Sequence, residues 1–279
     1  SPAFRSTQYY ANGSAMINAV NVYGNRSSRI ESIGYFWMAP VPLINVSRNY
    51  DIRFCPYIRK NYFVPIYAPM NDMHWRAMIG WSQQEVRLSL YEYFLCIGAR
   101  PWADVAAYDF NAEYDIGFYD WHAEATQAEI ARMEKWVMAR MLWGSNGEDV
   151  PKLRAYYLKR TYREAAKPIA RFFELVMRAA KERLTFASPM EFEDNEIIFR
   201  NTMRIKSGIF GKTVFEQLED CVVDAEKAAE SSVAKSEVAL FRAMWDKMRA
   251  AAEKAEEAWR KDVEGGADSK PMKIVGAPD

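Results

Sequence analysis

The sequence has few of the residues on which many catalytic and structural sites depend. Only three cysteines and two histidines occur among 279 residues. Cys55, Cys96 and Cys221 are odd in number and far apart, so they show neither a disulfide framework nor metal-ligand spacing, and we expect buried thiols. No glycine-rich phosphate loop follows any predicted strand, which removes the usual site for a nucleotide. We therefore predict no cofactor and no metal.

An excess of one charge is also missing. Lysine plus arginine and aspartate plus glutamate number 37 each, which removes the electrostatic argument for nucleic acid or an anionic membrane surface. No run of eighteen apolar residues exists, and the first ten residues lack the features of a signal peptide. We expect neither nucleic acid nor membrane as a partner. A segment cut from a longer precursor would lack a signal peptide too, so the compartment stays open.

Motifs of two common hydrolase classes are absent as well. The sequence contains no Gly-x-Ser-x-Gly elbow and no His-Glu-x-x-His helix. Serine-hydrolase and zinc-protease chemistry therefore have no support.

The first part of the chain is rich in aromatic residues, with 25 of the 40 lying in residues 1–124. Short runs of β-branched and aromatic residues predict strands, and longer stretches between them predict helices. The predicted strands are 30–37, 50–55, 88–94 and 115–119, and the predicted helices are 14–23, 71–84 and 102–114. This order indicates parallel strands joined by crossover helices. Four strands are too few for a closed eight-stranded barrel, but they could form part of one.

From Ala125 onward the apolar residues follow a helical period. A capping box at Thr126 and Asp149 followed by proline predict two helix starts, and Gly144 predicts an end. Further helices are predicted at 167–184, 191–206 and 213–231. A last helix carries a packing seam of residues spaced three and four apart: Val238, Phe241, Trp245, Met248, Ala252, Ala255 and Trp259. We thus expect an α/β region over 1–124, an all-α region over 125–263 and a flexible tail over 264–279.

Polar and aromatic residues follow the predicted strands at their carboxyl ends, where parallel α/β folds place their chemistry. Two carboxylates, Glu92 and Asp120, are candidates for acid and base in glycoside hydrolysis, because that reaction uses a facing carboxylate pair. Aromatic rings suit the apolar face of a sugar. The candidate substrate-binding residues are Trp37, Arg59, Tyr93, Trp121 and His122, with Lys60 beside Arg59.

Each candidate also has a structural interpretation. Glu92 could pair with an arginine at a strand end, although a carboxylate in an apolar strand is costly without a partner. Asp120 could cap or bridge locally while Trp121 packs under the next helix. His122 is more often a polar loop residue than a catalyst, and His74 is a weaker candidate. Three further acids of the region, Glu113, Asp115 and Glu124, are expected to be solvated charges or helix-end residues.

A longer series of segments resembles a known family. The runs RFCPYIRKNY, MNDMHWRAMIGWSQ, LYEYF and DIGFYDWHAE, followed by the segment Trp136 to Leu175, are similar to a bacterial domain of unknown function, number 4838. That family often follows an N-terminal domain like that of alpha-glucuronidases. The resemblance covers roughly residues 14–180. It implies a partial (β/α)8-type barrel that holds the later strands, followed by a helical C-terminal region.

The resemblance and the residues together lead to a functional expectation. We expect a carbohydrate-active, glycoside-hydrolase-like module that acts on a glycan by carboxylate acid/base chemistry. The alternative is a non-catalytic carbohydrate-binding or structural module of a larger secreted protein. The expected partners are carbohydrate and the N-terminal domains of the same parent chain. The resemblance implies a secreted or periplasmic location.

Overall fold

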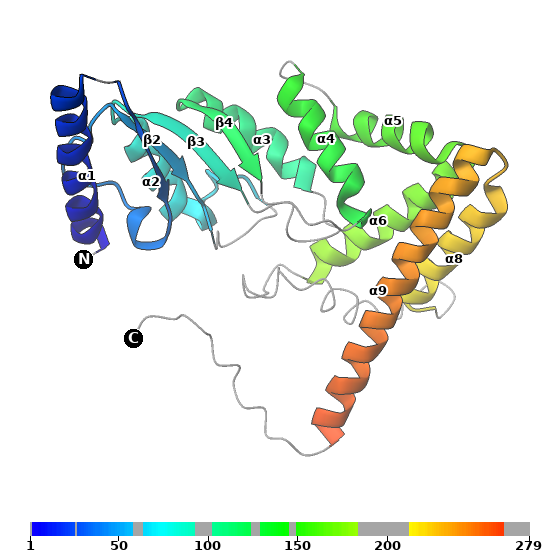
Figure 1. Cartoon of the computed structure of the whole chain (residues 1–279). Coiled ribbons are helices and arrows are strands. Elements are labelled where there is room, and N and C mark those ends of the chain that lie inside the picture. Colours follow the sequence, from blue (N-terminus) through cyan, green and yellow to red (C-terminus); the bar gives the residue numbers. More distant parts are fainter. Residues whose placement is uncertain are drawn as a thin grey trace.

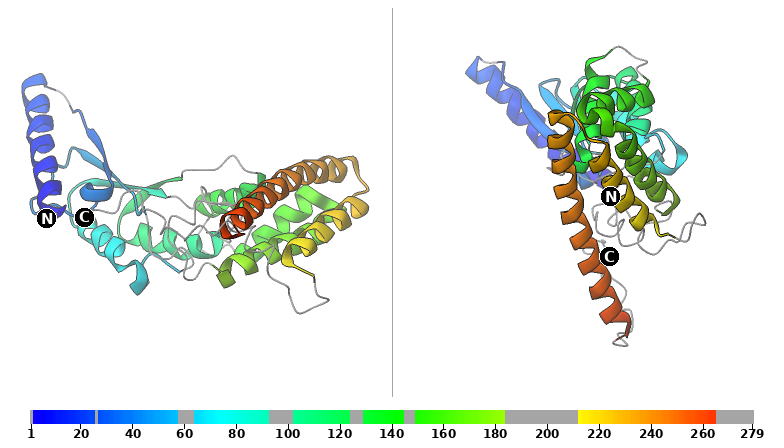
Figure 2. Two further views of the ribbon diagram at one scale, coloured as in Figure 1. Left: turned by 90° about the horizontal axis from the view of Figure 1, so that it is seen from below. Right: turned by 90° about the vertical axis from the view of Figure 1, so that its right-hand side faces the viewer.

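The computed structural model describes residues 2–25, 27–57, 64–92, 102–123, 129–144, 149–183 and 212–264. The molecule is elongated, with a sheet and helix α1 at one end and a group of long helices at the other (Figures 1 and 2). None of the helices in these ranges combines the length and the apolar character that crossing a bilayer requires.

A four-stranded parallel sheet forms the first part of the chain, as the sequence predicts. Its strands are β1 (Ile30–Gly34), β2 (Tyr50–Phe54), β3 (Arg87–Glu92) and β4 (Phe118–Ala123). They lie side by side in the order in which they occur in the sequence. The register between β3 and β4 is irregular between Leu88 and Ser89. The predicted combination of α/β and helical parts is therefore confirmed, whereas the four strands form an open sheet and no closed barrel among the described residues.

Two predicted strands differ from the observed ones. The sequence places a strand at 115–119, but β4 begins only at Phe118. Gly117 adopts a φ of +96°, and its amide donates to the Tyr114 carbonyl at 2.9 Å. This turn ends the preceding helix, so the chain must reverse before a strand can start. The first strand stops at Gly34, because Phe36 has a positive φ of 48° and starts a short 3₁₀ helix.

Three helices surround the sheet: α1 (Pro2–Gly24), α2 (Asp72–Ser82) and α3 (Trp102–Asp115). Helix α1 begins at Pro2 rather than at the predicted position 14. Tyr10 and Ile17, seven residues apart, are its buried contacts with the sheet. Gly13 lies against the sheet, since a Cβ there would stand 1.6 Å from the Tyr50 hydroxyl. This glycine permits close packing of the helix on β2 instead of making a turn.

The second part is helical, with α4 (Arg132–Trp143), α5 (Val150–Tyr162), α6 (Ala166–Arg183), α8 (Val214–Ala228) and α9 (Ser232–Glu264). The predicted start at Asp149 is confirmed, because its side chain accepts a hydrogen bond from the Lys152 amide. Gly144 ends α4 as predicted. Thr213 and Glu216 form a capping box at α8. The predicted capping box at Thr126 and the predicted helix 191–206 lie outside the described residues.

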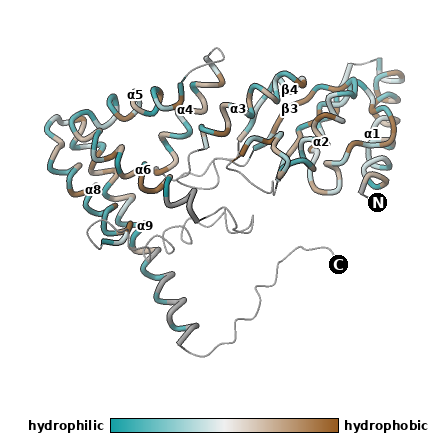
Figure 3. Tube along the Cα trace, turned by 180° about the vertical axis from the view of Figure 1, so that it is seen from behind, coloured by the Kyte–Doolittle hydropathy of each residue, from teal (hydrophilic) through white to brown (hydrophobic). Residues whose placement is uncertain are grey.

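Two hydrophobic clusters hold the chain together. One joins the sheet to α1 and α2, the other joins α3 to the helices that follow, and the partly buried Trp121 packs against both. In Figure 3 hydrophobic and hydrophilic segments alternate along the helices of this part. The predicted seam of α9 is confirmed for Val238, Phe241 and Trp245, which are buried. Met248 is partly buried, and the side chains of Ala252, Ala255 and Trp259 are not described. Cys55 and Cys221 are buried thiols, as predicted, and Cys96 is outside the described residues.

A buried ion-pair network connects α3, α4 and α5. Glu134 of α4 is 2% exposed and binds Arg154 of α5 through both carboxylate oxygens, at 2.6 and 2.8 Å. The same carboxylate accepts the Ala103 amide at the start of α3 at 3.0 Å. Arg154 also contacts Asp104 of α3 at 2.6 Å. Although burial opposes the charge of Arg154, its hydrogen bonds to Glu134 and the charges of Glu134 and Asp104 raise its pKa above the ordinary arginine value.

Replacement of Trp245 by alanine should destabilise the fold. Trp245 is fully buried and packs against Phe172 and Phe215, so its loss should lower the free energy of unfolding by about 3–5 kcal/mol. Leu240→Ala on the same helix is the control, because Leu240 is 54% exposed. Urea unfolding of both variants measures the difference. Equal stability of the two would show that α9 does not pack through this seam.

Removal of the Glu134 carboxylate should lower the free energy of unfolding more than removal of a similar acid near the surface. Glu134→Ala leaves the Ala103 amide and much of the Arg154 charge without their partner, which should cost about 3–5 kcal/mol. Glu237→Ala breaks the more exposed pair with Arg132 and should cost about 1 kcal/mol or less. Thermal and urea unfolding of both variants make the comparison. A Glu134 variant as stable as the Glu237 variant would contradict a structural role for the network.

Candidate functional site

The two faces of the sheet differ in chemistry. Residues that pair across parallel strands point to the same face, and neighbours along a strand alternate between faces. One face carries Ile52, Leu88 and Leu90, which pack in the cluster with α1 and α2. The other face carries Glu31, Ile33, Asp51, Arg53, Arg87, Ser89, Tyr91, Asp120 and His122. None of these nine belongs to either hydrophobic cluster of the described residues. We call this second face the open face.

A row of polar side chains crosses the open face. Arg53 pairs with Ser89, and Ser89 pairs with Asp120, so a cation, a hydroxyl and a carboxylate lie side by side on three neighbouring strands. Strands in a sheet are about 4.8 Å apart, which sets the length of this row at about 10 Å. Tyr91 and His122 form the next pair toward the carboxyl ends. A ligand the size of one or two sugar rings matches this span.

Asp120 and His122 form a hydrogen-bonded pair on the open face. His122 Nε2 and Asp120 Oδ2 are 2.8 Å apart, with side-chain exposures of 39% and 50%. The carboxylate orients the imidazole and favours a proton on Nε2, which leaves Nδ1 available to accept one. A solvent-accessible pair of this kind can move a proton to or from a bound hydroxyl group.

The guanidinium group of Arg53 is only partly satisfied by its neighbours. Its Nη2 forms an ion pair with Glu31, whereas its Nε is buried and has no hydrogen-bond partner among the described residues. Farther along the same face, Arg29 holds Asp51 at 2.7 Å. The acids of β1 and β2 are thus already paired with arginine. Asp120 is the open-face acid that is paired with histidine instead.

Aromatic rings gather just beyond the carboxyl ends of β1 and β2. Tyr35, Phe36 and Tyr57 contact one another, with ring centroids 4.1 to 5.6 Å apart. Phe36 is 59% exposed and has a positive φ of 48°, which is rare for a bulky residue and costs about 1–3 kcal/mol. An aromatic ring held in solvent by a strained backbone is a candidate for ligand contact.

Glu92 lies on the covered face with two further carboxylates. It is the last residue of β3 and is fully buried, together with Asp109 and Glu113 of α3. One oxygen from each residue lies within 4.8 Å of the others. Asp109 Oδ1 also accepts the Ile66 amide at 2.7 Å, and each of the three residues has at least one further interaction. Three carboxylate oxygens at this separation could hold a hard cation such as Mg²⁺ or Ca²⁺.

The two predicted catalytic carboxylates are not brought together. Glu92 pairs with Ala123 and Asp120 pairs with Ser89, three positions earlier on β3, so their side chains point to opposite faces. The expected loop after β4 is also wrong, because Asp120, Trp121 and His122 lie within the strand. The strand starts later than predicted, and these residues therefore follow its alternation.

The other candidates have varied surroundings. Trp121 points to the covered face and packs on Phe110 with ring centroids 4.9 Å apart. Trp37 is 42% exposed and contacts Tyr9 of α1. His74 is buried in α2. The remaining candidates, Arg59, Lys60 and Tyr93, lie outside the described residues.

The three acids that were expected to be solvated or at helix ends differ in their surroundings. Glu113 lies near the end of α3, as one alternative has it, but it is 3% exposed and is therefore no solvated charge. Asp115 is exposed as expected. Glu124 lies outside the described residues.

Several residues of the open face and of the buried carboxylate cluster around Glu92 were not predicted from the sequence as parts of a site. Ser89 and Tyr91 alternate with buried leucines along β3, and this alternation was a usable signal for a face that differs from the core. Asp109 and Glu113 are four residues apart on α3, which places them on one helix face. No local pattern indicates that this face is the buried one.

A comparison with models of protein families confirms the resemblance noted in the sequence. The model of DUF4838, a domain of unknown function, matches residues 13–174, and the chain belongs to this family. No curated protein and no solved structure matches the chain.

Proposed function

We propose that the open face and the aromatic cluster beside it bind carbohydrate and that the domain is a carbohydrate-active module. The observation that carries the proposal is the row Arg53, Ser89 and Asp120 on the open face, together with the solvent-exposed ring of Phe36 beyond the end of β1. Sugars present hydroxyl groups at their edge and an apolar C–H surface on their face. A site with both polar groups and an exposed ring matches these two surfaces.

The proposed chemistry centres on Asp120 and His122. With a glycosidic oxygen over the open face, the pair would accept or donate the proton that cleavage requires. Glycoside hydrolysis ordinarily uses two carboxylates. Glu92 does not supply the second one from its buried position on the opposite face. This separation favours the alternative function, in which the module binds glycan without cleaving it.

A partial barrel is the architecture that we propose for this site. Four neighbouring parallel strands in sequential order are also the arrangement of strands in a (β/α)8 wall. In such a wall the open face would point to the barrel interior, and the carboxyl ends would line its mouth. The proposed glycan would then enter from the side of Phe36 and His122.

Substitution of Asp120 should separate binding from catalysis. A glycan array identifies an oligosaccharide bound by the chain, and its affinity is then measured by calorimetry. Asp120→Asn should weaken binding at least about tenfold if the carboxylate holds a sugar hydroxyl, because hydrogen bonds to charged groups contribute about 1.5–3 kcal/mol. If the chain also releases reducing sugar, the same change should lower turnover by at least about a hundredfold.

Asp115→Asn is the matched control for this experiment. Asp115 is an exposed aspartate at the end of α3, so its replacement makes the same chemical change away from the open face. The control should bind and react like the unaltered chain. Equal affinity and turnover in the two variants would contradict the proposed site, and reducing-sugar release that Asp120→Asn leaves unchanged would restrict the proposal to binding.

A further inference from the structure

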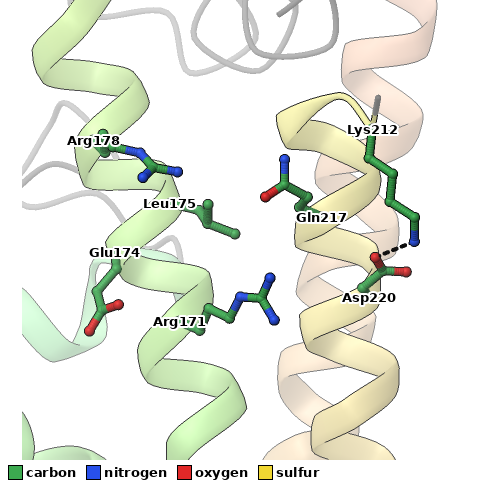
Figure 4. A pocket seen from close by; sticks show the side chains of 7 residues that line it. All are labelled: Arg171, Glu174, Leu175, Arg178, Lys212, Gln217 and Asp220. Carbon is green, nitrogen blue, oxygen red and sulfur yellow. Dashed lines mark hydrogen bonds and ion pairs between the residues drawn. The ribbon is translucent and has the colours of Figure 1, made fainter. Parts of the chain in front are cut away.

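A charged groove runs between α6 and α8, at the opposite end of the molecule from the sheet. Two neighbouring cavities of about 690 and 680 Å³ lie along it and share Arg171 and Glu174. Figure 4 shows the first cavity, with residues of α6 on one side and residues of α8 on the other. Volumes of this size are typical of sites for small molecules.

The α6 side of the groove is positively charged. Lys167, Arg171 and Arg178 recur at intervals of four and seven residues, which places them on one face of the helix. Arg171 and Arg178 have no hydrogen-bond or ion-pair partner among the described residues. Both extend toward α8 in Figure 4, with Leu175 between them, whereas Glu174 points the other way. Elsewhere in the helical part, arginines such as Arg242 are held by glutamates.

The α8 side adds little free charge of either sign. Lys212 is paired with Asp220, and Lys227 lies 3.8 Å from Asp224. Gln217 contributes an amide between the two helices. Among the described residues, the groove therefore retains Lys167, Arg171 and Arg178 as cations without an ion-pair partner, and Glu174 as a carboxylate without one. Its unsatisfied groups are hydrogen-bond donors that match an oxyanion.

Neither the first turn of α8 nor the thiol of Cys221 offers a second site for an anion or a reaction in the groove. The amide of Glu216 at the start of α8 already donates to Thr213 Oγ1, so the first turn of α8 is capped by the chain itself. Burial raises the pKa of the Cys221 thiol to about 11, an effect that the charge of Arg171 opposes. The thiol is therefore protonated at neutral pH and is not a nucleophile.

We propose that the groove between α6 and α8 binds a small anionic ligand bearing a carboxylate or a phosphate, held by Arg171 and Arg178. Guanidinium groups bind both anions through paired, charge-assisted hydrogen bonds. The seven-residue separation of the two arginines corresponds to about 10.5 Å along the helix. A ligand with its anion at one arginine can therefore lie along Leu175 toward the other. This inference is independent of the glycan proposal, because it concerns different residues.

Calorimetry at low salt tests the proposal with three probes: inorganic phosphate, succinate and the neutral analogue succinamide. We expect phosphate, succinate or both to bind, and succinamide not to bind. The double variant Arg171→Gln/Arg178→Gln should weaken anion binding at least about tenfold, with unchanged circular dichroism because both side chains are exposed. A rise in salt should weaken binding by the unaltered chain, since mobile ions screen exposed charges.

Arg160→Gln on α5 is the matched control, because it removes an exposed arginine that does not line the groove. It should bind the anions like the unaltered chain. Binding of phosphate alone would identify the ligand as a phosphate compound, and binding of succinate alone would identify a carboxylate. The proposal is overturned if neither anion binds, if succinamide binds as well as succinate, or if the double variant retains full affinity.

Discussion

One buried carboxylate joins α3, the helix that packs against Trp121 of the sheet, to the helices that follow it. Glu134 binds the Arg154 guanidinium through two hydrogen bonds and the amide of Ala103 through a third. These contacts hold α4, α5 and the first turn of α3 in one position. A buried ion pair of this kind contributes little net stability compared with an apolar core, but it is very costly to break, so it fixes a particular arrangement. The position of α3 follows from it.

Helix α3 in turn determines what each face of the sheet can do. It places Asp109 and Glu113 against Glu92 and its Phe110 against Trp121, so the acids and the tryptophan on that face are enclosed. The open face carries Arg53, Ser89, Asp120 and His122 without belonging to either hydrophobic cluster of the described residues. The division follows from the two-residue alternation of strands, which sends neighbouring side chains to opposite sides.

The fold was more predictable than the site, for a physical reason. Strand order and helix starts such as Asp149 depend on local patterns, which a sequence displays directly. The pairing of Glu92 with Asp120 instead required the exact start of β4, and the turn at Gly117 moved that start by three residues from 115 to 118. The irregular register between Leu88 and Ser89 then turns Asp120 to the face opposite Phe118, although the two are only two residues apart. The burial of Glu113 depended on a contact between distant segments, which no local pattern specifies.

The central claim is that the open face, and not the covered one, is the functional surface of the domain. A crystal structure of the chain with an oligosaccharide identified by glycan array tests this most directly. The account predicts sugar hydroxyl groups within hydrogen-bond distance of Ser89 and Asp120, and a sugar ring against Phe36. An oligosaccharide bound elsewhere on the chain, with the open face covered by other protein segments, would contradict it.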